Sequence, residues 1–275
     1  MNKRPVFERI LLRENDSNLV RVKTKARRKI GIWGMSSAAG VTLLTFSIAR
    51  YIANLKQDVP AVLELSDGDE GLTGWNYDAI GIDKRFIGRE YFSFYRNTCD
   101  GAGIKNVVNM DEGINWALRM PAEFDCELDI QQMTSLINNI AGDVTICDFS
   151  SRLRLGEENA DDRLECFRRL FRDMSLLIFV VDPAPSKLLG GGKRLSLVKE
   201  LEHAGIKVLY VVNMFQRGVN RKELLNFLKP ARKATIGYIP ADAIYEAEYN
   251  CKNPFQMPAV KEAVTPAIET ALELL

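Results

Sequence analysis

Residues 33 to 42, WGMSSAAGVT, are mostly small and could place backbone amides around an anion. They join the apolar run KIGIWG (29–34) to the helix-like run VTLLTFSIARYIANL (41–55). The first N–H groups of a helix have no partner within it, and they attract phosphate. The chemistry that this stretch could support is therefore phosphate binding. A strand-to-helix turn without a ligand has the same composition, so the loop alone leaves both interpretations open.

The stretch follows the phosphate-loop pattern G-x-x-x-x-G-K-[ST] only in part. Placing Gly40, Val41 and Thr42 on its G-K-T puts Met35 at the first position, one residue after Gly34. The Thr42 hydroxyl would bind Mg²⁺, but Val41 replaces the lysine that meets the terminal phosphates. The expected nucleotide-binding residues of the loop are Gly34, Met35, Ser36, Ser37, Ala38, Ala39, Gly40, Val41, Thr42 and Leu43.

The missing lysine bears more on catalysis than on binding. Electrostatic stabilisation of the transition state is usually the largest catalytic term in phosphoryl transfer. Main-chain amides would still hold phosphates with an apolar residue at position 41, with lower affinity and much slower hydrolysis. The loop therefore predicts at most a weak ATPase.

Two polar residues end later strand-like runs. Asp148 in DVTICDFSS would hold Mg²⁺ together with Thr42, and it is the candidate catalytic residue. Asn213 ends VLYVVN, at a position where an amide can face a nucleotide base. The ligands of open α/β sheets bind at the carboxyl ends of the strands, where both residues are expected.

Apolar strand-like runs and amphipathic helix-like runs alternate along the chain. Strands are expected at 29–34, 61–65, 143–149, 175–182, 207–213 and 234–240, and helices at 41–55, 134–141, 161–174, 193–205, 221–228 and 258–275, the last interrupted or started by Pro266. Strands that are apolar throughout are typical of parallel sheets buried on both faces. We therefore expect one doubly wound, mostly parallel α/β domain over 29–275, with an insertion over about 67–128 after the second strand.

Composition narrows the class of protein. The 275 residues have a formal net charge of +1, and the five cysteines are scattered: Cys99, Cys126, Cys147, Cys166 and Cys251. With one histidine, His203, this pattern predicts a reduced cytoplasmic protein without a zinc site. No apolar run approaches the ~20 residues of a membrane span, so no transmembrane segment is expected.

Positive charge is concentrated at the beginning of the chain. Residues 1–30 contain ten Lys and Arg against three Asp and Glu. A basic arm over 1–28 could touch nucleic acid or anionic lipid, whereas charged termini are more often solvated leaders. Nucleic-acid binding through this arm is therefore kept as an alternative that is not favoured.

The order of these motifs resembles the MinD/ParA branch of the P-loop ATPases. The matching stretches are KIGIWGMSSAAGVTLLTFSIARYIA, TICDFSS, VVDPAPSKL, VVNMFQRGVN and IPADAIYEAEYNCKNPF, which together span most of residues 29 to 258. Within the branch, the chain is most similar to the divergent CpaE- and TadZ-type proteins, which are associated with placing Flp/Tad pilus machinery. The resemblance implies a P-loop NTPase fold, ATP or ADP with Mg²⁺, a homodimer, and Pro240 near the base. It also implies a place in the cytoplasm or, through partners, at the membrane or cell pole.

The chain departs from the branch at its charged positions. The lysine that reaches across the dimer in ParA-type loops corresponds to Ser36, and the D-x-D after the second strand falls on Glu64 and Ser66. These departures favour a localisation or assembly scaffold, for example for pilus or secretion machinery. Two alternatives stay open: a slow ATPase with a relocated lysine or arginine, such as Lys187, Lys193 or Arg194, and a partition-like protein that binds DNA without sequence preference.

Overall fold

The structure is a computed structural model that describes residues 27–65, 110–111, 113–117, 130–149, 160–214, 218–228, 232–250 and 252–275. Most of the basic arm and most of the range 67–128 lie outside these residues. The expectations for those two segments therefore stay predictions.

A single sheet organises the described residues. In chain order its strands are β1 (Arg28–Gly34), β2 (Pro60–Glu64), β3 (Met110–Asp111), β4 (Ile114–Ala117), β5 (Val144–Phe149), β6 (Leu176–Val181), β7 (Val208–Val212) and β8 (Arg232–Thr235). Their spatial order is β3-β4-β2-β5-β1-β6-β7-β8, and only the β3–β4 pair is antiparallel. This arrangement confirms the doubly wound, mostly parallel α/β fold.

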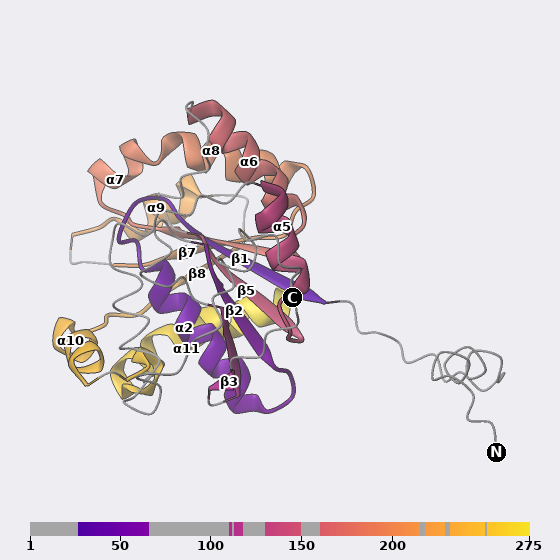
Figure 1. The fold of residues 1–275 in the computed structure, drawn as a ribbon. Coiled ribbons are helices and arrows are strands. Elements are labelled where there is room, and N and C mark those ends of the chain that lie inside the picture. Colours follow the sequence, from indigo (N-terminus) through magenta and orange to yellow (C-terminus); the bar gives the residue numbers. More distant parts are fainter. Residues whose placement is uncertain are drawn as a thin grey trace, which may run out of the picture.

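Helices cover both faces of the sheet (Figure 1). They are α2 (Val41–Leu55), α5 (Ile130–Asn139), α6 (Ala160–Arg172), α7 (Pro185–Gly190), α8 (Gly192–His203), α9 (Arg221–Phe227), α10 (Ala241–Tyr249) and α11 (Pro258–Leu274), with the short 3-10 helix η3 (Pro254–Gln256). Side chains alternate along β1, so that Ile30 and Ile32 pack with α2 and α11 whereas Trp33 packs with α6 and α8 on the other face. The sheet is therefore buried on both sides, as its apolar strands predict.

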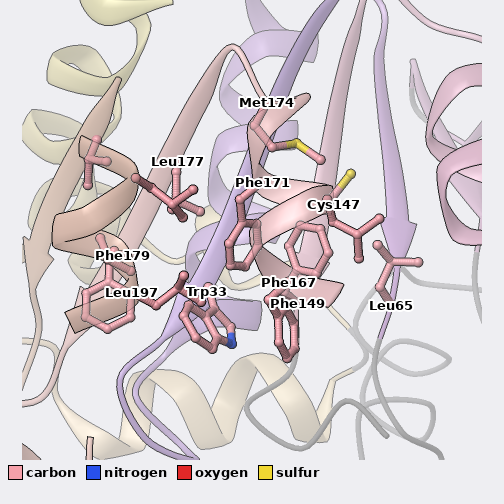
Figure 2. Packing of buried hydrophobic residues seen from close by; sticks show 14 of the residues in the cluster. Trp33, Leu65, Cys147, Phe149, Phe167, Phe171, Met174, Leu177, Phe179 and Leu197 are labelled. Atoms are coloured by element: carbon pink, nitrogen blue, oxygen red, sulfur yellow. The ribbon is translucent and has the colours of Figure 1, made fainter. Parts of the chain in front are cut away.

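An aromatic cluster fills the face beneath α6. Trp33 stacks on Phe167 with ring centroids 4.9 Å apart, and it also contacts Phe171 and Phe179. Figure 2 shows these rings together with Phe149, at the end of β5. Because Trp33 is the residue before Gly34, this cluster anchors the strand from which the candidate phosphate loop departs.

The sheet edge next to β2 comes from the range 67–128. The strand β4 pairs in parallel with β2, with Val62 opposite Trp116. Trp116 packs on Phe46 of α2, with ring centroids 5.3 Å apart. This part of the expected insertion therefore belongs to the sheet itself.

Several element boundaries differ from those expected: the helix expected at 134–141, for example, is α5 (Ile130–Asn139), and two further differences have a clear physical cause. The last strand was expected at 234–240, but β8 ends at Thr235 because the amide of Gly237 donates to Ala263 of α11, 2.9 Å away, and so leaves the sheet. Pro266 neither starts nor interrupts the last helix: α11 begins at Pro258 and continues through Pro266 to Leu274. Proline costs one helical hydrogen bond, which the buried apolar side of α11 outweighs.

Three basic side chains tie the start of β1 to its neighbours. Arg27 donates from Nη1 to the carbonyl oxygen of Asn138 at 2.6 Å, and Arg28 pairs with Asp58 at 2.5 Å. Lys29 is buried and forms an ion pair with Asp173. These contacts lie at the amino-terminal edge of the sheet, opposite the end of β1 that leads into the loop.

Two further expectations, on the cysteines and on membrane spans, can be compared with the structure only within the described residues. Cys147 is buried in β5, and burial raises the pKa of its thiol, so it packs as a small apolar side chain. Among the described helices, none is both long and apolar enough to cross a bilayer.

Candidate nucleotide site

The loop between β1 and α2 has the backbone conformation of a sharp strand-to-helix turn. Met35 still extends the sheet, because its amide donates to Val180 at 2.9 Å. Ala38 and Gly40 then adopt the left-handed conformation, with φ of 58° and 97°. Gly40 is the N-cap of α2 and provides no side-chain cap. The amides of the first turn of α2 are therefore left to a ligand or solvent.

Val41, which stands where the phosphate-loop pattern has a lysine, packs into the hydrophobic core. Its side chain is 9% exposed and belongs to the hydrophobic cluster beneath α2. A Cβ added to Gly34 would lie 2.9 Å from Cγ2 of Val41, so these two residues pack directly. Position 41 therefore contributes apolar packing and no charge.

Asp148 and Glu64 lie side by side beneath the start of α2. They are opposite each other in the parallel register of β5 and β2, and both are almost fully buried. Burial and, after it, repulsion by Glu64 raise the pKa of Asp148, whereas the hydroxyls of Thr42 and Thr45 lower it, and the net pKa is about 7. The structure thus brings together Thr42 and Asp148, the two expected Mg²⁺ ligands, and it adds Glu64 and Thr45.

Several polar atoms around the loop lack a hydrogen-bond partner. They are Oδ1 of Asp148, Oγ1 of Thr45, Oγ of Ser36 and Nε1 of Trp33. The Thr45 hydroxyl is thus near enough to affect Asp148 but makes no hydrogen bond of ordinary geometry. Buried polar groups of this kind are usually satisfied by water or a ligand. Their position matches a polar ligand at the loop.

These residues fit a magnesium ion that arrives with a nucleotide. The described residues hold no group of three or more His, Cys, Asp or Glu side chains that could bind a metal ion alone. Magnesium is usually held by one or two carboxylates together with phosphates and water. Asp148 and Thr42 match that requirement, and the amides of the loop match the phosphates.

Asn213 holds the end of the loop. Its Nδ2 donates to the carbonyl oxygen of Ala39 at 2.8 Å, and its side chain is only 5% exposed. A Cβ at Gly40 would lie 2.3 Å from the same nitrogen. The structure therefore brings Asn213 to the loop backbone. The expected role of Asn213 toward a base stays a prediction, and so does that of Pro240, which lies in the turn before α10.

Arg194 and Gly191 hold the beginning of the loop. Nη1 of Arg194 donates to the carbonyl oxygens of Gly34 and Met35 at 3.2 and 3.3 Å, and its guanidinium lies over the ring of Trp33. A Cβ at Gly191 would lie 2.3 Å from Cγ of Met35. The sequence suggests Arg194 only as one of several cations, because its approach to the loop depends on the packing of α8.

Solved structures of known proteins share the fold of the chain. A ParA family ATPase from Chlorobium tepidum TLS superposes with a TM-score of 0.70 at 14% identity, over 92% of this chain and 100% of that one. The chain has the fold of the ParA and MinD ATPases. A plasmid partition protein from Borrelia burgdorferi B31 bound to AMPPNP gives 0.63 at 15% identity, over 90% of this chain and 97% of that one.

A third structure with this fold carries a nucleotide and a metal ion. The septum site-determining protein MinD from Pyrococcus horikoshii OT3, complexed with Mg-ADP, gives a TM-score of 0.62 at 15% identity, over 90% of this chain and 96% of that one. A scan of protein-family models and a search of curated proteins found no match. The likeness to known proteins is thus one of fold.

Proposed function

We propose that this protein binds ATP or ADP with Mg²⁺ at the loop 34–43 and acts as a localisation or assembly scaffold. One observation carries the proposal: Gly40 is left-handed at the start of α2 and leaves the first helical amides uncapped, while Val41 packs into the core instead of supplying a cation. Structures of the same fold with AMPPNP and with Mg-ADP support the choice of ligand.

Each residue of the site has a distinct part in binding. The amides at the start of α2 would hold the phosphate oxygens, and the helix dipole favours their negative charge. Thr42 and Asp148 would hold Mg²⁺, which neutralises phosphate charge when bound. With no lysine at position 41, little stabilisation is added at the terminal phosphate. Nucleotide binding therefore sets a shape and does not lead to rapid turnover.

The scaffold acts through a partner at the carboxyl edge of the sheet. Leu189 of α7 is 84% exposed and lies two residues before Gly191, which packs against the loop. We propose a second copy of this chain there, together with a component of pilus or secretion machinery in the cytoplasm, at the membrane or at the cell pole.

Calorimetry with ATP and ADP, each with and without Mg²⁺, tests nucleotide binding. We expect micromolar binding that depends on Mg²⁺ and weakens about tenfold in Thr42→Ala, which loses a hydroxyl bonded to a cation. Thr270→Ala is the matched control, because the Thr270 hydroxyl bonds Pro266 on the distant helix α11. Absence of binding at millimolar nucleotide would contradict the proposal.

A slow ATPase is the second candidate, and the place of Arg194 favours it. This guanidinium lies next to the first loop residues, and a relocated cation would also have to reach the phosphates, beyond the carbonyl oxygens that Nη1 bonds. Steady-state ATP turnover decides between the two. A rate equal to that of Asp148→Ala supports the scaffold, and a rate well above it supports the enzyme.

A further inference from the structure

The loop is held at both of its ends by side chains that come from outside it. Asn213, directly after β7, bonds the carbonyl oxygen of Ala39 near the end of the loop. Arg194, in the first turn of α8, bonds the carbonyl oxygens of Gly34 and Met35 at its beginning. Both contacts are made to main-chain oxygen atoms.

The guanidinium of Arg194 is fixed by three consecutive residues. Its Cζ lies 5.6 Å from the ring centroid of Trp33, and its Nη1 is shared between the next two carbonyls. Burial lowers the pKa of Arg194, although an arginine stays charged in either case. Hydrogen bonds from a charged donor in a partly desolvated place are stronger than those at the surface.

The packing of α8 keeps Arg194 in this place. Gly191 is buried against Met35, and a Cβ there would meet both the side chain and the carbonyl oxygen of Met35 within 3 Å. The beginning of α8 therefore approaches the loop as closely as a backbone can. If the start of α8 lay farther from the loop, the guanidinium of Arg194 would not reach the two carbonyl oxygens.

We infer that Arg194 is a positioning residue, which holds the start of the loop in its phosphate-binding shape while Asn213 holds the end. The inference rests on the proposed function for its ligand. Arg194 acts through the loop backbone, because its donor is turned to carbonyl oxygens. Its removal must then weaken every ligand that uses the loop amides, whatever the number of phosphates.

Nucleotide affinity in three variants tests this role. Arg194→Met keeps the length and removes the donors, Arg194→Lys keeps a donating cation, and Arg221→Met removes a surface arginine that bonds Thr235. We expect Arg194→Met to weaken ATP and ADP by the same factor, about tenfold, from the loss of charged hydrogen bonds. Arg194→Lys restores part of this loss, and Arg221→Met binds like the unchanged chain.

A loss of affinity for ATP that is much larger than the loss for ADP would overturn the inference. If Arg194→Met weakens ATP far more than ADP, Arg194 contacts the terminal phosphate directly and is a relocated cation. If neither nucleotide is affected in a variant that melts at the same temperature as the unchanged chain, Arg194 does not position the loop.

Amide hydrogen exchange of peptides that cover residues 35–42 gives a readout without nucleotide. We expect faster exchange in Arg194→Met, partial recovery in Arg194→Lys, and no change in Arg221→Met. If the unchanged chain binds no nucleotide, the proposed function fails, yet this exchange pattern still supports the hold of Arg194 on the loop. Unchanged exchange in Arg194→Met would overturn the inference even where nucleotide binds.

Discussion

At the scale of single residues, the candidate site combines buried carboxyl groups with a loop whose backbone conformation and packing at position 40 favour glycine. Asp148 lies next to Glu64, and its Oδ1 atom has no hydrogen-bond partner. Gly40 has a φ of 97° and lies directly against Asn213. Both features can be tested without knowing the ligand.

Asp148 gives the protein an unusual dependence of stability on pH. Its pKa is about 7 in the folded chain against an ordinary value of 3.8, so between these values the folded state keeps a proton that the unfolded state has lost. Its contribution to stability is therefore full below about pH 4 and falls as pH rises toward 7, by on the order of a few kcal/mol. Asp148→Asn removes this loss.

Urea unfolding at pH 5, 6, 7 and 8 measures the effect. The free energy of unfolding of Asp148→Asn should gain on that of the unchanged chain as pH rises from 5 to 7, and the gap should then stay constant. Glu262→Gln, an exposed change on α11, is the control and should show a constant gap throughout. A gap that stays constant from pH 5 to 8 would mean that Asp148 is already charged in the folded protein throughout this range.

A comparison of Gly40 with Gly205 distinguishes backbone strain from steric collision. Gly205 has a similar φ of 93° but open space where a Cβ would be, whereas a Cβ at Gly40 meets Asn213 Nδ2 at 2.3 Å. Gly205→Ala should lower the free energy of unfolding by about 1 kcal/mol, and Gly40→Ala by about 1 to 2 kcal/mol more. Thermal or urea unfolding compares the two. Equal losses would show that Asn213 simply moves aside.

At the scale of helices and strands, the sequence best predicts the elements in which apolar residues recur at a regular spacing. The first helix was expected at 41–55 and has these bounds, since an apolar stripe and a glycine before it mark both its face and its start. The shorter β8 depends on a hydrogen bond from Gly237 to α11, which no local pattern reveals.

The residues of the candidate site also divide into those that local motifs predict and those that depend on long-range packing. Thr42 and Asp148 could be placed from motifs, because each follows or ends a strand whose carboxyl end is predictable. The pairing of Glu64 with Asp148 requires the register of β2 on β5, and the approach of Arg194 requires the packing of α8. Local patterns in a single sequence do not predict long-range contacts of this kind.

The contact between α8 and the loop can be tested with neighbouring glycines. Gly191→Ala places a methyl group against Met35 and should lower the free energy of unfolding by about 1 to 3 kcal/mol. Gly192→Ala meets nothing within 4 Å and should leave stability unchanged or raise it by up to about 1 kcal/mol. Unfolding by urea measures both, and equal effects would argue against a close approach of α8.

At the scale of the whole molecule, the two ends of β1 serve different surfaces. Its carboxyl end leads into the candidate nucleotide site, whereas its amino end is tied to α5 through Arg27 and Lys29. Because the ends of a strand lie at opposite edges of the sheet, a ligand at the loop and a partner at residues 27–29 would not compete for space.

Two truncations test the anchoring of β1. A chain that begins at Arg27 should unfold with the same free energy as the full chain, because the contacts of Arg27, Arg28 and Lys29 remain. A chain that begins at Ile30 loses them and should be less stable by on the order of 2 to 3 kcal/mol. Urea unfolding compares the three chains, and an equal loss in both truncations would place the anchor before Arg27.

The same truncation decides the alternative of DNA binding. Salt-sensitive binding of DNA without sequence preference, lost in the chain that begins at Arg27, would support the partition-like interpretation. Equal or absent binding in the two chains would remove it. Nucleotide binding at the loop should be the same in both.

The hold of Arg194 and Asn213 on main-chain oxygens has a consequence for how mutations are tolerated. A carbonyl group is the same in every residue, so the shape of the loop is encoded largely outside the loop. In a saturation mutational scan scored by folding, Ser37 should accept many residues, whereas Gly40, Gly191 and Arg194 should accept few. The information that specifies this turn is therefore spread over three distant segments of the chain, and a pattern written along residues 35–40 alone captures little of it.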